Sequence, residues 1–305
     1  MQAQTYGKWR MYLSDGSGED SPLTEALRTY SRKDTRIRII ENNCQLHISE
    51  NTNRALSEAE GDYIVFLDHD DMLSPDALYE CVKAVNNYPE AEVIYTDSDK
   101  VSEDGKTYSE PCFKPDFNID LLRCQNYICH LTVLRKSLID KVGYLNPEYN
   151  GVQDYDYILR CVEQTEKIVH IPKVLYHWRM CPGSVAVDSE NKAYTYELFL
   201  QVLREHYMRL GIKAQVRRLF PGVARTVYEL TSEPLVSVII ANKDHRNDLV
   251  RCIESLEQDS DYKNLEILIV ENNSTSEEIF AYYEQVRKRY CLLYTSPSPR
   301  DRTRS

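Results

Sequence analysis

An apolar run that ends in a cluster of acidic residues is the feature that most constrains the fold of this chain. Residues 63–67 are Tyr-Ile-Val-Phe-Leu, and the next four are Asp68, His69, Asp70 and Asp71. A short β-branched and aromatic run is typical of a buried strand, so we expect the acids where that strand leaves the core. In open α/β sheets, this is the edge at which ligands bind.

The spacing of Asp68 and Asp70 suits a divalent cation. Side chains two residues apart on an extended segment point the same way, and carboxylate oxygens are ligands that Mg²⁺ or Mn²⁺ prefers. The alternative is an acidic turn before a helix, since the Ser-Pro-Asp sequence at 74–76 is typical of a helix N-terminus. Asp97 and Asp99 repeat the alternating pattern after another strand-like run and are the main competing ligands.

Strand-like and helix-like segments alternate along the chain. Apolar runs recur at residues 10–13, 37–40, 63–67, 93–95 and 128–134, and helical patterns occur at 52–59, 75–86, 152–164 and 197–210. Such alternation predicts βαβ units, and therefore an α/β fold with a mostly parallel sheet and helices on both faces. The sequence contains no Gly-x-Gly-x-x-Gly or Walker pattern and so does not support a dinucleotide-binding or P-loop fold.

Two segments 257 residues apart resemble each other. Residues 9–13 lead into a polar turn that ends at Ser17, and residues 266–270 lead into one that ends at Ser274. The second copy is preceded by a further apolar run, 236–240, whose counterpart would lie ahead of Met1. We therefore expect the first copy to lack its opening strand, which would be central in a parallel sheet and would line the ligand crevice.

These patterns predict three regions. Residues 1–230 form a first domain, residues 231–291 begin a copy of it, and residues 292–305 form a disordered tail. The tail is rich in Pro, Ser and Arg and has no periodicity. It resembles translated sequencing-adapter read-through, so it is excluded from the fold prediction; a basic interaction tail is the alternative.

Composition limits the classes of function. A formal net charge of −11 argues against nucleic acid as the main partner, because binding phosphate backbones requires clustered Lys and Arg. No apolar run is long enough to span a bilayer, and the first residues do not resemble a signal peptide. Nine cysteines without a Cys-x-x-Cys pair favour a reducing cytoplasm. Cys124, Cys129 and His130 lack a fourth zinc ligand at suitable spacing, so buried thiols are the simpler interpretation.

Four short elements, in this order, resemble those of a family 2 glycosyltransferase with the GT-A (nucleotide-diphospho-sugar transferase) fold. They are Ser-Asp-Gly-Ser at 14–17, Asp-His-Asp-Asp at 68–71, Gln-Asp-Tyr-Asp at 153–156 and Tyr-His-Trp-Arg at 176–179. Each is weak alone, but their order and the spacer at 61–67 make the set specific. The resemblance covers residues from about 4 to 230, and 234–285 resemble the start of a second such domain.

The resemblance implies an inverting transfer of a sugar from a UDP- or dTDP-sugar donor to a hydroxyl of a glycan or lipid-linked acceptor, in cell-surface polysaccharide synthesis. It implies Mn²⁺ or Mg²⁺ held by Asp68 and Asp70, with Asp71 as a substitute and His177 as a further ligand. It also implies a cytoplasmic protein that associates peripherally with the inner face of the membrane, in a parent chain with a second glycosyltransferase domain.

By the same resemblance, Asp154 is the general base that takes the proton of the acceptor hydroxyl. The nucleotide sugar would be bound by Asp15, Asn53, Asp68 and Arg179. Each assignment has a structural alternative: Asp154 as a first-turn helix acid, Asp15 as part of a tight turn, Asn53 as a helix cap, and His177 as a hydrogen-bonded core residue.

The sequence departs from the family pattern at two positions. Ser14 stands where the family often has an acid, and Gln153 stands where it commonly has Glu. A catalytically inactive sugar- or nucleotide-binding fragment is the alternative function, and the missing opening strand is the reason for it. Ser14 and Gln153 would support this alternative only if Asp70 and Asp154 lay far apart. A nucleotidyltransferase would also use acids and metal, but it should carry a glycine-rich basic segment early in the chain, and none is present.

Overall fold

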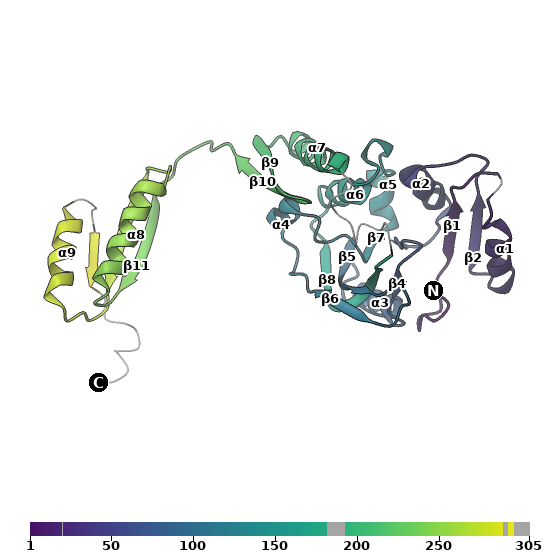
Figure 1. The fold of residues 1–305 in the computed structure, drawn as a ribbon, viewed down its shortest axis with the longest axis horizontal. Helices are drawn as coiled ribbons and strands as arrows, with labels where there is room; N and C mark the ends of the chain where they lie inside the picture. The colour runs from purple at the N-terminus through teal and green to yellow at the C-terminus, as the bar shows by residue number, and fades with distance from the viewer. Residues whose placement is uncertain (20, 182–192, 289–291, 296–305) are drawn as a thin grey trace. The chain divides into compact units, whose positions relative to one another are not determined.

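The computed structural model describes residues 1–19, 21–181, 193–288 and 292–295, which form two units, Met1–Glu229 and Leu230–Ser305 (Figure 1). Of the predicted disordered tail, residues 296–305 lie outside the described residues. Leu292–Thr295, in contrast, forms a strand, β13, parallel to the preceding strand of the second unit. Leucine, tyrosine and threonine favour a strand, and these four residues pair with β12 although the tail as a whole has a polar composition.

The first unit contains a six-stranded sheet that holds the site. Its strands are β3 (Tyr63–Val65), β4 (Met72–Leu73), β5 (Val93–Val101), β6 (Tyr108–Cys112), β7 (Thr132–Arg135) and β8 (Ile168–Arg179). They pair in the order β3-β7-β5-β8-β4, with β6 on β5. Among these described strands only β5 and β8 run parallel, so the sheet is mixed rather than mostly parallel. The prediction of a mostly parallel sheet was wrong because a run of apolar residues indicates only that a strand is buried. The direction of each strand depends on the segments that connect the strands.

Helices cover both faces of this sheet, as the sequence predicts. They are α3 (Ala77–Asn87), α4 (Ile119–Cys124), α5 (Lys136–Val142), α6 (Gln153–Val162) and α7 (Ala193–Leu210), with a short 3-10 helix at Pro147–Tyr149. Successive residues of β5 point to opposite faces. Tyr95 packs in a cluster with Tyr155 of α6 and Phe199 of α7, whereas Ile94 packs with Cys81 of α3.

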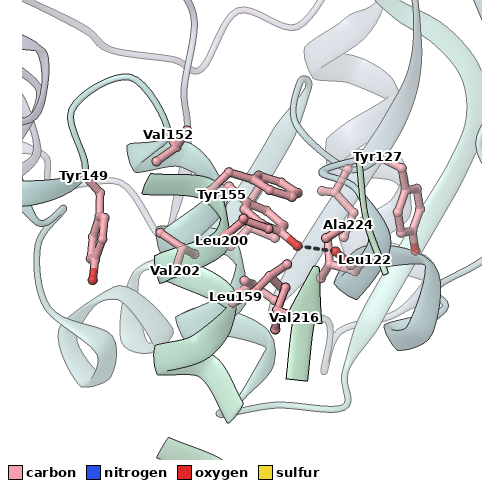
Figure 2. Close-up of a cluster of buried hydrophobic side chains, with 14 of the residues drawn as sticks. Leu122, Tyr127, Tyr149, Val152, Tyr155, Leu159, Leu200, Val202, Val216 and Ala224 are labelled. Carbon is pink, nitrogen blue, oxygen red and sulfur yellow. Dashed lines mark hydrogen bonds between the residues drawn. The ribbon is translucent and has the colours of Figure 1, made fainter. Parts of the chain in front are cut away.

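The larger cluster fixes α6, the helix that carries the predicted base. Figure 2 shows Tyr155 and Leu159 of α6 facing Leu200 of α7, with Val216 close by. The Tyr155 hydroxyl donates a hydrogen bond of 2.6 Å to the carbonyl of Leu122 in α4. Because this hydroxyl is buried, the bond compensates for its lost hydration and sets the position of α6. Val216 belongs to a hairpin of β9 (Ala214–Phe220) and β10 (Val223–Tyr228).

The two predicted repeats have the same local topology. In the first unit, β1 (Met11–Asp15), α1 (Thr24–Lys33) and β2 (Ile37–Glu41) form a parallel pair with a helical crossover, followed by α2 (Ile48–Glu58). In the second unit, β12 (Leu265–Glu271), α9 (Glu277–Arg287) and β13 do the same.

The second unit has one more strand beside this motif. β12 also pairs with β11 (Val236–Asn242), which α8 (Arg246–Asp259) follows, whereas β1 pairs only with β2 among the described strands. The missing opening strand of the first copy stays a prediction. None of the helices that the structure describes is long and apolar enough to cross a bilayer.

Candidate active site

The order of the strands brings several predicted site residues to one edge of the six-stranded sheet. β7 runs antiparallel to both neighbours, with Val133 opposite Val65 of β3 and Thr132 opposite Tyr95 of β5. The chain that leaves β3, the chain that enters β7 and the second half of β5 therefore meet at the same edge. We call residues 126–130, which enter β7, the bridging segment.

The bridging segment contacts both the predicted base and a predicted metal ligand. The Oδ2 atom of Asp154 accepts hydrogen bonds from Nδ2 of Asn126, at 2.8 Å, and from Sγ of Cys129, at 3.2 Å. At the other end, Nε2 of His130 lies 3.4 Å from Oδ2 of Asp68. One short segment thus ties together two carboxylates that are far apart in the sequence.

A buried lysine holds the bridging segment in place. Nζ of Lys114 donates to the carbonyls of Ile128 and His130, at 2.7 and 2.6 Å, and its backbone N–H donates to Oδ1 of Asp97 at 2.9 Å. Sequence reasoning missed both Lys114 and Asn126. A single Lys between polar and aromatic neighbours carries no periodic signal, and lysines are usually exposed.

Lys114 predicts a pH dependence of stability. Burial lowers the pKa of Lys114 from 10.5 to about 8. Between these values the unfolded chain binds more protons than the folded one, so folding is increasingly favoured as pH rises from about 8 to 10.5. We expect the free energy of unfolding of the wild type, relative to Lys114→Met, to increase by up to about 3 kcal/mol over this range, from 1.36 kcal/mol per pKa unit. Urea unfolding of both proteins at several pH values measures this difference, and a constant difference would contradict the prediction.

The three acids after β3 differ in their surroundings. The side chain of Asp68 is about half exposed. The partial loss of water around its carboxyl would raise the pKa of Asp68, but the hydrogen bond and charge of His130 outweigh this effect, so the pKa is lowered. Asp71 accepts hydrogen bonds from the Tyr176 hydroxyl and, at 2.8 Å, from the backbone N–H of Arg179, and burial raises its pKa. Asp71 therefore holds the loop against β8, and Asp68 and Asp70 are the acids available to a ligand.

The donor set of Asp68 and Asp70 fits a hard divalent cation. The side chain of Asp70 is partly exposed, and its only described ion-pair contact is with His69 at 3.9 Å, so its oxygens are available. Carboxylate oxygens suit Mg²⁺ or Mn²⁺. No group of three or more His, Cys, Asp or Glu side chains in the described part of the chain is arranged to hold a metal by itself.

The competing acids on β5 are committed to histidines. Oδ1 of Asp97 lies 2.8 Å from Nε2 of His170, in addition to its bond from the Lys114 backbone. Oδ1 of Asp99 lies 2.5 Å from Nδ1 of His177, because Asp99 and His177 are directly paired in the parallel β5–β8 ladder. Both acids are buried or partly buried within the sheet, which favours the earlier pair as cation ligands.

His177 has a protein partner at each ring nitrogen. Besides Asp99 at Nδ1, Nε2 of His177 lies 3.1 Å from Oγ of Ser74. The ring is buried, and its edge meets the ring of Tyr108. His177 could reach a cation only by giving up one of these two contacts. The contacts join β8 to the chain around β4, and the role of His177 as a metal ligand stays a prediction.

Arg179 supports the acidic loop from behind. Its Nε donates to the carbonyl of Asp70 at 2.6 Å, and one terminal nitrogen donates to the carbonyl of Glu103 at 2.7 Å. Two of the five N–H donors of this guanidinium are therefore used within the protein. The predicted contact with a diphosphate stays a prediction.

The turn after β1 is held by hydrogen bonds of Asp15 within the turn and of Asn51 of α2. The backbone N–H of Ser17 donates to Oδ1 of Asp15 at 3.0 Å, which is the tight-turn alternative. Burial would raise the pKa of Asp15, but the hydrogen bonds of Ser21 and Ser17 lower it. Asn51 contacts this turn through the side chain and carbonyl of Ser14, at 2.6 and 2.9 Å.

Asn53, the predicted nucleotide contact, is engaged elsewhere. Its amide nitrogen donates to the carbonyl of Leu145 at 2.8 Å, and its oxygen accepts from the N–H of Leu145 at 2.9 Å. This pair of bonds fastens α2 to the segment before the 3-10 helix. Because residues two apart lie on different faces of a helix, Asn51 faces β1 and Asn53 does not. The sequence alone did not show which of the two asparagines contacts the turn after β1.

Comparison with known proteins identifies the family that this chain resembles. Residues 1–143 match the family model described as Glycosyl transferase family 2. The chain is 39% identical over 290 residues to the uncharacterized protein y4gI of Sinorhizobium fredii and 36% identical over 293 residues to the O-antigen biosynthesis protein RfbC of Myxococcus xanthus. The matches cover 94% and 93% of this chain but only 32% and 22% of those proteins.

Among solved structures, the chain resembles Staphylococcus aureus TarS 1–349 in complex with UDP-GlcNAc. The TM-score is 0.52 at 15% sequence identity, over 66% of this chain and 58% of that one. The fold defines the first unit as a GT-A domain. The chain carries a domain of glycosyl transferase family 2, and its relatives include a protein of O-antigen biosynthesis.

Proposed function

We propose that the first unit transfers a sugar from a nucleotide diphosphate donor to an acceptor hydroxyl, with inversion at the anomeric carbon. The observation that carries this proposal is the bridging segment, which contacts both Asp154 and Asp68. Transfer requires a base beside the incoming hydroxyl and charge stabilisation beside the departing diphosphate. The bridging segment contacts Asp154, the proposed base, and Asp68, a proposed metal ligand, so it brings both requirements to one part of the structure.

Asp154 acts as the base in this proposal. Both of its described hydrogen bonds are made by Oδ2, so Oδ1 is the oxygen left to accept the proton of the acceptor hydroxyl. As the acceptor oxygen bonds to the anomeric carbon, the bond from that carbon to the diphosphate oxygen breaks, and the proton moves to Asp154. Asn126 and Cys129 hold the carboxylate in the orientation that this transfer needs.

Asp68 and Asp70 would hold Mn²⁺ or Mg²⁺ in this proposal. When bound, the cation would neutralise the negative charge that develops on the leaving group. His130 orients Asp68, and Arg179 fixes the backbone of Asp70 through its carbonyl. Asp15 and its turn, which Asn51 braces through Ser14, would contact the nucleoside.

The donor and the biological role are also proposals. TarS binds UDP-GlcNAc, which supports a uridine nucleotide, and the relative RfbC supports a role in cell-surface polysaccharide synthesis. We propose a UDP- or dTDP-sugar donor and a glycan or lipid-linked acceptor. The cytoplasmic face of the membrane is the place where such donors and acceptors meet.

A thermal-shift screen tests the proposal directly. UDP, dTDP, GDP and CDP are added with Mn²⁺ or with EDTA, and we expect UDP or dTDP to raise the melting temperature only with the metal. Release of the nucleotide from the matching nucleotide sugar is then measured. No stabilisation by any nucleotide would contradict the proposal, and stabilisation without turnover would favour a nucleotide-binding protein that lacks transfer activity.

A further inference from the structure

The β9–β10 hairpin ends in an exposed apolar tip. Leu219 is 50% exposed and Phe220 is 66% exposed, and Pro221 and Gly222 complete the turn, with Gly222 at a φ of +70°. Leu219 and Phe220 are the last two residues of β9. Two large apolar side chains exposed at consecutive positions present more nonpolar surface than an isolated surface residue does. Such a tip is typical of a contact surface.

The hairpin is anchored, so the tip has a defined position. Val216 of β9 and Ala224 of β10 are buried in the cluster that also contains Leu203 and Tyr207 of α7. The Tyr207 hydroxyl lies 2.8 Å from the hydroxyl of Thr226 on β10. The core contacts of the hairpin are therefore made by Val216 and Ala224, and Leu219 and Phe220 do not belong to the buried cluster.

Arginines surround the apolar tip. Arg217, Arg218 and Arg225 are all exposed, and Arg217 lies directly opposite Arg225 in the ladder. Like charges directly opposite each other destabilise a strand pair. No carboxylate among the described residues lies within ion-pair distance of these three side chains; Arg217 contacts Gln215 at 3.1 Å, and Arg218 lies 4.3 Å from the centre of the Tyr196 ring. Within the part of the chain that the structure describes, this positive patch has no carboxylate partner, and it belongs to a chain of net charge −11.

We propose that the exposed side chains at the end of this hairpin dock the first unit on an anionic phospholipid surface. These side chains are Leu219 and Phe220 with Arg217, Arg218 and Arg225. Exposed apolar side chains that enter the headgroup region, flanked by arginines that meet lipid phosphates, are the chemistry by which peripheral proteins bind such surfaces. An acidic glycan would account for the arginines and the phenylalanine ring. It would not account for Leu219, whose exposure is favourable only against an apolar partner.

Vesicle sedimentation with the full chain tests the proposal, and no sugar donor is needed. Each arginine near an anionic lipid surface contributes about fivefold to the affinity for vesicles. The triple variant Arg217→Gln/Arg218→Gln/Arg225→Gln should therefore bind vesicles about 100-fold more weakly than the wild type. The tip variant Leu219→Ser/Phe220→Ser should lose about tenfold or more. Wild type should bind phosphatidylglycerol-containing vesicles more tightly than phosphatidylcholine vesicles, and less tightly at high salt.

A matched control separates the tip from general surface apolarity. Leu23 and Phe113 are 53% and 73% exposed, close to the values at the tip, and we expect Leu23→Ser/Phe113→Ser to bind vesicles as the wild type does. Equal losses in the control and tip variants would overturn the proposal. So would wild-type binding to a soluble acidic polysaccharide but not to vesicles. Melting temperatures within a few degrees of wild type show that the variants are folded.

Discussion

Asp154→Asn is expected to lower the rate of sugar transfer by about 10²- to 10⁴-fold, the usual contribution of a general base. Asparagine keeps the shape of the side chain and can still accept the hydrogen bonds of Asn126 and Cys129 at its oxygen. What it loses is the ability to take the proton of the acceptor hydroxyl. Binding of UDP with Mn²⁺, measured by calorimetry, should stay within about twofold of the wild type, because Asp154 acts on the acceptor side.

The control for this prediction is Asp120→Asn. Asp120 is a first-turn acid at the second residue of α4, as Asp154 is at the second residue of α6. If Asp154 only stabilises the N-terminus of its helix, both substitutions should cost about 0.3–1 kcal/mol of stability and neither should change the transfer rate. The rate is followed as release of UDP from the UDP-sugar that the thermal-shift screen selects. A rate for Asp154→Asn near that of the wild type would exclude the residue as the base.

Asp70→Asn is expected to weaken metal-dependent binding of UDP by at least about tenfold, because a neutral amide is a poorer ligand for a hard cation than a carboxylate. The carboxylate of Asp70 is partly exposed. The backbone carbonyl of Asp70, which the substitution does not change, accepts the hydrogen bond of Arg179. The melting temperature should therefore hardly change. Titration of UDP in the presence of Mn²⁺ and in EDTA measures the metal-dependent part.

Asp71→Asn provides the matched comparison. The carboxylate of Asp71 accepts bonds from the Tyr176 hydroxyl and the Arg179 backbone, and an amide can be correctly oriented for only one of these donors. We expect a loss of stability of about 1–3 kcal/mol with the metal dependence of UDP binding retained. If Asp71→Asn abolished the metal dependence and Asp70→Asn did not, the assignment of the two acids would be reversed.

The location of the site follows from local patterns in the sequence. The apolar run at 63–67 packs the end strand β3 against the core, where its residues are partly buried. The acids that follow lie at an edge of the sheet because carboxylates are costly to bury. The helical pattern at 152–164 places Asp154 in the first turn of α6 by the same kind of argument. Such features depend on neighbours within a few residues.

The partners of the site residues depend on contacts between distant segments. Lys114, the bridging segment and Asp154 meet only because β7 inserts antiparallel between β3 and β5, which no local pattern reports. The contact between His177 and Asp99 likewise depends on the register of two distant strands, and the role of His177 at a metal stays a prediction.

The sequence by itself determined which segments are buried and where chemically reactive side chains leave them, since burial depends on composition and period. Only the tertiary structure decided which of those side chains are free to bind a ligand. Strand order and register place Asp71, Asp97 and Asp99 against protein partners in buried or partly buried positions. Asp68 keeps a half-exposed carboxylate beside His130, and the described ion-pair contact of Asp70 is with His69. The physical reason is that a carboxylate has few lone pairs to share, and its nearest donor is chosen by the packing of segments that can lie more than a hundred residues away.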